Sequence, residues 1–66
     1  MEITLNGEPR QIGHDTTLAG LVEALGYTGK RIATERNGEI VPKSQYADTR
    51  LAAGDRLEIV VAVGGG

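Results

Sequence analysis

The sequence contains no cysteine, no tryptophan and no phenylalanine, and it has a single histidine. Without cysteine the chain can form neither a disulfide framework nor a thiolate metal site, and it has no thiol nucleophile. Its 66 residues can form one small domain, of a size that buries only about 60% of its unfolded surface. We therefore expect the core to hold by packing alone. The shortage of acid–base groups and of room for an enclosed site argues against catalysis by the chain itself.

Positive charge is also scarce. Lys and Arg total 7 against 9 Asp and Glu, which gives a formal net charge of −2 and a pI near 5.2. Nucleic-acid phosphates call for a basic face, so we expect no nucleic-acid partner. No apolar run approaches the roughly 20 residues of a membrane span, and the first ten residues lack the basic start and apolar centre of a signal peptide. We expect a cytoplasmic protein without a membrane segment, whose partner is a basic or neutral protein.

The first part of the chain predicts a β-hairpin. Residues 1–5 alternate polar and apolar side chains, which is typical of a strand with one buried face. Asn6-Gly7 follows at once and is the strongest short hairpin signal, because both central residues of a type I′ turn need positive φ. Residues 8–12 should therefore pair back antiparallel to the first strand. Pro9 marks this second strand as a sheet edge.

Residues 14–29 change from the period of a strand to that of a helix. One apolar stripe at spacing i, i+3, i+4 and i+7 is formed by Leu18, Leu21, Val22 and Leu25. The candidates for the N-cap are Asp15, Thr16 and Thr17. Gly26 follows the last turn of this helix, at the position where a residue in the left-handed conformation commonly ends a helix. A helix of two to three turns is marginal in isolation, so its stripe must pack on a sheet.

The middle of the chain predicts a second hairpin. Residues 31–36 and 39–41 read as strands joined by Asn37-Gly38. The pattern leaves open which face of the first of these strands is buried.

The last third predicts a crossing segment and a final strand. Residues 43–55 read as an irregular or short helical crossing with Tyr46 and Leu51 as its anchors. Residues 56–63 form the longest apolar strand of the chain, and its inward side is expected to carry Leu57, Ile59, Val61 and Val63.

The order of these elements predicts an α+β fold. A helix between two hairpins covers one face of a mixed sheet, and the most apolar strand takes the middle. A last strand placed beside and parallel to the first gives the ubiquitin-like β-grasp arrangement, with a sheet of four to five strands and one main helix on one face. We expect this domain over residues 1–63 and a flexible glycine tail over residues 64–66.

The root of the tail is a candidate docking surface. If Leu57 and Ile59 face the helix, then Val60 and Ala62 face away from it, on a side of the sheet that no second helix covers. An apolar patch beside a functional segment often marks a docking site. The residues expected to bind a partner are therefore Val60, Ala62, Val63, Gly64 and Gly65.

The terminal glycines are suited to carry a reactive group at the end of the chain into the active site of a partner. Glycine lacks a Cβ, so its backbone can pass through a slot too narrow for any side chain. The tip would carry a main-chain carboxylate on Gly66, which is ionised at neutral pH and resists nucleophilic attack until it is activated.

The whole chain resembles the ThiS family, bacterial ubiquitin-like sulfur carriers of thiamine biosynthesis. The resemblance rests on "LNGEPR" near the start, the "TTLAGLVEALG" helix, "RIATERNGEIVP" in the middle and "GDRLEIVVAVGGG" at the end. The combination of "ERNGEIVP" with a terminal "VGGG" is the most specific of these, because Gly-Gly also ends ubiquitin-like modifiers and other sulfur carriers.

The resemblance implies a mechanism centred on Gly66. An adenylyltransferase of the ThiF type would adenylate its carboxylate, and a persulfide from a cysteine desulfurase or a related relay would displace AMP. The resulting thiocarboxylate would give its sulfur to a thiazole synthase of the ThiG type. Gly65 would be the required penultimate glycine. The chain would be a co-substrate and not an enzyme, and ATP and Mg²⁺ would belong to the activating partner, so the chain itself binds no cofactor or metal.

Three alternatives stay open at the level of sequence. The same tail chemistry could serve molybdopterin synthesis or tRNA thiolation. The chain could instead be a protein modifier that forms an isopeptide bond through Gly66. It could also be a passive interaction domain with inert glycines.

Overall fold

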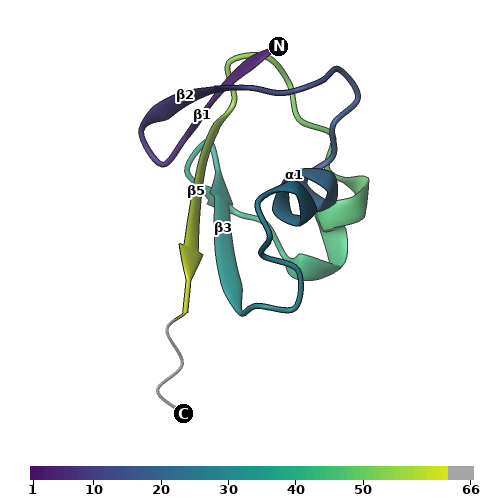
Figure 1. Ribbon diagram of the computed structural model, residues 1–66. Coiled ribbons are helices and arrows are strands. Elements are labelled where there is room, and N and C mark those ends of the chain that lie inside the picture. Colours follow the sequence, from purple (N-terminus) through teal and green to yellow (C-terminus); the bar gives the residue numbers. More distant parts are fainter. Residues whose placement is uncertain (63–66) are drawn as a thin grey trace.

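The computed structural model describes residues 1–62 (Figure 1). The predictions for Val63 and for the glycine tail fall outside the described residues. Within that range the elements follow the predicted order, with two helical and five extended segments: β1 (Glu2–Leu5), β2 (Glu8–Gln11), α1 (Leu18–Ala24), β3 (Ile32–Arg36), β4 (Glu39–Ile40), the 3₁₀ helix η1 (Lys43–Asp48) and β5 (Arg56–Val61).

The five strands of residues 1–62 form one mixed sheet in the order β2-β1-β5-β3-β4. β5 pairs parallel with β1, where Leu5 lies opposite Leu57, and antiparallel with β3 on its other side. The prediction that the most apolar strand is central and lies beside the first is confirmed. β2 carries Pro9 and is an edge strand, as predicted. This is the ubiquitin-like β-grasp arrangement.

Both Asn-Gly turns have the predicted geometry. Asn6 and Asn37 have φ values of 51° and 53°, and the glycines that follow them, Gly7 and Gly38, have φ values of 83° and 86°. Positive φ at both central residues identifies a type I′ turn, whose twist matches that of the strands it joins.

The short helix α1 is held by its cap and by its apolar stripe. Thr17 is the N-cap, and its Oγ1 accepts a hydrogen bond from the backbone N–H of Gly20 at 3.1 Å. The stripe packs into the core through Leu18, Leu21 and Val22, with Leu25 half-buried at the C-cap. Gly26 has a φ of 78°, which confirms the predicted left-handed ending.

The core lies between α1, η1 and one face of the sheet (Figure 1). The question left open by the sequence is answered by Thr34, which is fully buried and faces the core from β3. Tyr46 of η1 donates a hydrogen bond from its hydroxyl to Thr34 Oγ1 at 2.9 Å, so the buried threonine has a partner. Tyr46 and Leu51 are both buried, which confirms them as anchors of the crossing segment.

Candidate functional site

The central strand β5 leads to the predicted tail. Its far end lies beside the beginning of β3, where Val61 is opposite Ile32. The backbone N–H of Ala62 donates to the carbonyl of Arg31 at 2.8 Å, so the last described residue is still bonded to the neighbouring segment. The tail therefore begins at an end of β5 that is held by β3, whereas β1 pairs only with the start of β5 at Arg56 and Leu57. Gly64, Gly65 and Gly66, the residues to which the chemistry is assigned, lie outside the described residues.

The face of the sheet opposite α1 carries exposed apolar side chains. Val60 is 64% exposed and alternates with the buried Leu57 and Ile59, and Ala62 is also exposed. Cross-strand pairing places Ala33 on this face opposite Val60. We call this side of the sheet the open face. The structure thus puts Val60 and Ala62 on the side expected from the alternation; their role as a docking surface stays a prediction.

The open face also carries two carboxylates directly opposite each other. Glu35 of β3 pairs with Glu58 of β5 and, on its other side, with Ile40 of β4, whose side chain is 66% exposed. Like charges directly opposite in a sheet are destabilising, and neither glutamate has an ion-pair partner among residues 1–62. The apolar side chains and this pair of carboxylates therefore share the open face, and the exposed Arg56 lies on the same side of β5 next to the pair.

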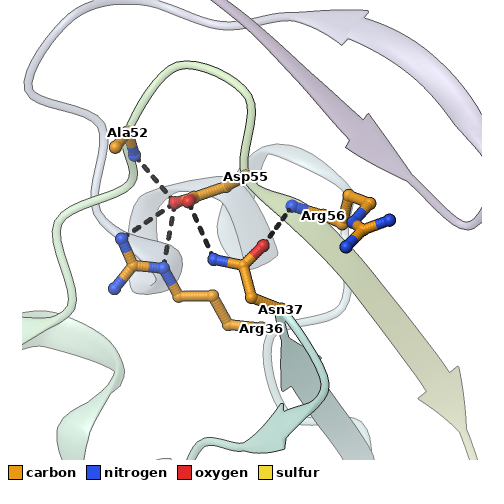
Figure 2. Close-up of polar contacts among 5 residues, drawn as sticks. All are labelled: Arg36, Asn37, Ala52, Asp55 and Arg56. Carbon is orange, nitrogen blue, oxygen red and sulfur yellow. Dashed lines mark hydrogen bonds and ion pairs between the residues drawn. The ribbon is translucent and has the colours of Figure 1, made fainter.

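Asp55 is a buried carboxylate just before β5, and donors surround it (Figure 2). Its Oδ2 accepts from the backbone N–H of Ala52 at 2.8 Å and from Nε of Arg36 at 2.9 Å, and Arg36 Nη2 lies 2.9 Å from the same oxygen. Its Oδ1 accepts from Asn37 Nδ2 at 3.1 Å. The Oδ1 atom of Asn37 in turn accepts from the backbone N–H of Arg56 at 2.9 Å. This Asp55 network joins the turn before β5 to the turn between β3 and β4.

The Asp55 network lowers the pKa of its carboxyl. Burial on its own raises the pKa of Asp55, because desolvation disfavours the charged form. Hydrogen bonds from the Ala52 backbone, from Asn37 and from Arg36, together with the positive charge of Arg36, act in the opposite direction and prevail. The carboxylate is therefore ionised at neutral pH and holds the start of β5 through charge-assisted hydrogen bonds.

The Asp55 network was not predicted from the sequence, which placed Asp55 only at the end of the crossing segment, residues 43–55. A signal was present in the Asn37-Gly38 turn, because an asparagine at such a position offers a free side-chain amide close to the neighbouring strand. Within residues 1–62 no cluster of histidine and carboxylate side chains is placed to hold a metal ion. No helix in that range is both long and apolar enough to cross a membrane.

Comparison with known proteins identifies the family. The fold and the candidate site define a class of small proteins: β-grasp domains whose central strand leads to a glycine-rich C-terminal end. A sequence model of the ThiS family matches residues 3–66. The chain belongs to the ThiS family. A crystal structure of the thiamine biosynthesis protein ThiS from Geobacter metallireducens superposes with a TM-score of 0.83 at 29% identity and covers 100% of both chains.

Similar sequences include a sulfur carrier and two thiazole synthases. The sulfur carrier protein ThiS of Bacillus subtilis is 37% identical over 65 residues, which cover 97% of this chain and 98% of that protein. Thiazole synthases of Paramagnetospirillum magneticum and Magnetococcus marinus are 46% and 41% identical over 66 residues. The chain spans only 20% of the length of these two synthases, so the match concerns one part of them.

Proposed function

We propose that this chain carries sulfur for the formation of the thiazole part of thiamine, and that the sulfur is held as a thiocarboxylate on Gly66. The observation that carries the proposal is the match to the Bacillus subtilis sulfur carrier along nearly the whole of both chains. The similarity to thiazole synthases supports a synthase of that type as the acceptor and favours it over molybdopterin synthesis or tRNA thiolation.

The first proposed step activates the carboxylate of Gly66. A carboxylate of pKa about 3.3–3.7 is ionised at neutral pH and is a poor electrophile. An adenylyltransferase of the ThiF type, with its own ATP and Mg²⁺, would let a carboxylate oxygen attack the α-phosphorus of ATP. The bond to pyrophosphate breaks, pyrophosphate leaves, and Gly66 becomes an acyl adenylate.

The second proposed step brings in the sulfur. The terminal sulfur of a persulfide, carried by a cysteine desulfurase or a relay protein, attacks the acyl carbon and AMP leaves, which gives an acyl disulfide. A second thiol then reduces the sulfur–sulfur bond. The thiol becomes part of a disulfide, and Gly66 keeps a thiocarboxylate. When that sulfur passes to the substrate of a thiazole synthase, an oxygen atom from that substrate or from water takes its place on Gly66 and the carboxylate returns. The chain is therefore a recycled co-substrate and not an enzyme.

Partner enzymes would bind the chain through its folded domain, residues 1–62. Val60 and Ala62 lie on the open face at the end of β5 that leads to the tail, and the Glu35–Glu58 pair lies further along the same strands. Ordering a flexible segment costs about 1–2 kcal/mol per residue, which contacts made by the body must offset. Docking through the open face would supply those contacts.

Sulfur loading can be measured by intact mass. After incubation with ATP, Mg²⁺, a ThiF-type adenylyltransferase and a cysteine desulfurase, we expect the chain to gain the mass difference of one oxygen replaced by sulfur, localised to Gly66. The reaction without ATP is the control. If the same enzymes load Bacillus subtilis ThiS but leave this chain unchanged, the proposal is wrong.

Docking through the open face can be tested with two matched substitutions. Val60→Glu should weaken binding to the adenylyltransferase by about tenfold or more, since it puts a charge into an apolar contact. Ile40→Glu is the control, because Ile40 has nearly the same exposure on the same face but lies on the edge strand away from the tail. Titration calorimetry gives the two affinities, and equal effects of both substitutions would refute docking centred on Val60.

A further inference from the structure

The two Asn-Gly turns do more than reverse the chain. Their asparagine side chains reach the central strand β5 from its two sides, Asn6 from the β1 side and Asn37 from the β3 side. Asn6 Oδ1 accepts from the backbone N–H of Ile59 at 2.8 Å, and its Nδ2 donates to the carbonyl of the same residue at 3.3 Å. Asn37 bonds Arg56 through Oδ1 and Asp55 through Nδ2. Both ends of each amide are therefore engaged.

Asparagine followed by glycine is also a chemically labile pair. Because glycine has no side chain to hinder the approach, its backbone nitrogen can attack the side-chain amide carbon of the preceding asparagine. A carbon–nitrogen bond forms, the bond to the side-chain nitrogen breaks, and ammonia leaves. Water then opens the resulting succinimide ring to give aspartate or isoaspartate.

We propose that Asn6 and Asn37 are deamidation sites that the folded state keeps closed, and that modification of Asn37 irreversibly loosens the start of β5. To close the ring, the amide must leave both of its hydrogen bonds and the peptide that follows must rotate away from the type I′ geometry. Each of these changes requires the turn to open first. The reaction is therefore confined to molecules in which the turn has opened locally or the domain has unfolded.

The two sites differ in what their modification does. Conversion of Asn37 to aspartate replaces a donor with a second carboxylate, at a position where Nδ2 lies 3.1 Å from Asp55 Oδ1. Two carboxylates at that distance repel, and neither can donate to the other. Asn6 has no carboxylate among its hydrogen-bond partners and would lose only its long contact to the Ile59 carbonyl. Isoaspartate at either site would lengthen the backbone of a two-residue turn.

The proposal is tested by following deamidation site by site in the same molecule. The full chain is held at mildly alkaline pH in buffer or in urea, and peptide mapping by mass spectrometry gives the fraction modified at Asn6 and at Asn37. We expect both rates to rise by about tenfold or more in urea, since each amide loses two hydrogen bonds. Equal rates in buffer and in urea would overturn the proposal.

Two variants separate local protection from overall stability. Asp55→Ala removes the partner of Asn37 Nδ2 and should accelerate deamidation at Asn37 more than at Asn6. Leu21→Ala lowers stability through the core without touching either amide and should accelerate both sites by the same factor. If Asp55→Ala also accelerates both sites by one factor, protection by the network is refuted.

The consequence of modification is tested with aspartate at each position. Asn37→Asp should increase the unfolded fraction by about tenfold relative to the native sequence, whereas Asn6→Asp should change it by a few-fold at most. Urea titration followed by circular dichroism gives both values. Equal effects of the two substitutions would contradict the assignment of Asn37 as the damaging site.

Discussion

Replacing Gly65 with valine is expected to abolish sulfur loading while the domain stays folded. Under the proposed function the tail passes through a channel of the activating enzyme, and a branched side chain beside Gly66 would hold the carboxylate away from ATP. Displacement of a reacting group by about 1 Å can cost about a hundredfold in rate. We therefore expect acyl-adenylate formation, measured as pyrophosphate release, to fall by at least about a hundredfold.

Smaller substitutions in the tail provide the controls for Gly65→Val. Gly65→Ala adds one methyl group and should give an intermediate loss. Gly64→Ala should lose less activity than Gly65→Ala, because Gly64 is one residue further from the reacting carboxylate of Gly66. Thermal unfolding of all three variants should match that of the native sequence, since the core lies within residues 1–62. If the Gly65→Val chain were adenylated at the native rate, the activating enzyme would not require a small residue next to Gly66.

Replacing Asp55 with alanine is expected to remove about 2–4 kcal/mol from the free energy of unfolding. The substitution strips the Arg36 guanidinium of its carboxylate and leaves the backbone N–H of Ala52 and the Asn37 amide without their acceptor. A domain of this size has little stability to spare, so such a loss should lower the urea midpoint clearly. Asp48→Ala is the matched control, because Asp48 is exposed and forms no ion pair among residues 1–62.

The effect of Asp55→Ala should depend on pH in a defined direction. The pKa of Asp55 is lower in the folded state than its ordinary value of 3.8. Its contribution is therefore fully present above that ordinary value and is lost as the pH falls through the lower folded value. Urea titrations should show a constant gap between the native sequence and the variant at neutral pH, and a shrinking gap below pH 3.8. A gap that grows in acid would contradict the assigned shift.

Local patterns were enough to predict the architecture. The alternation of Leu57, Ile59 and Val61 and the two Asn-Gly dipeptides each report on a few neighbouring residues. Rules of strand connection then left few ways to combine the elements. The leucine stripe predicted α1 and its packing on the sheet equally well, because an isolated helix of this length is not stable.

Contacts between distant residues could not be predicted in the same way. Which face of β3 is buried depends on Thr34 meeting the hydroxyl of Tyr46, twelve positions away. The Asp55 network depends on a turn geometry that brings Arg36 to a residue nineteen positions further along the chain. A buried threonine and a buried aspartate both look like surface residues in a sequence, since their burial is made possible by partners that only the fold brings near.

The placement of β5 has a mechanical consequence for a chain that is pulled by its C-terminal end. β5 pairs with β3 from Leu57 to Val61 and with β1 only at Arg56 and Leu57, so a pull along its axis loads these backbone hydrogen bonds in shear. An edge strand such as β2 could instead be peeled away one bond at a time. An enzyme that draws the end of this chain into its active site would therefore pull on a strand whose hydrogen bonds are loaded together, and not on one that can be peeled away.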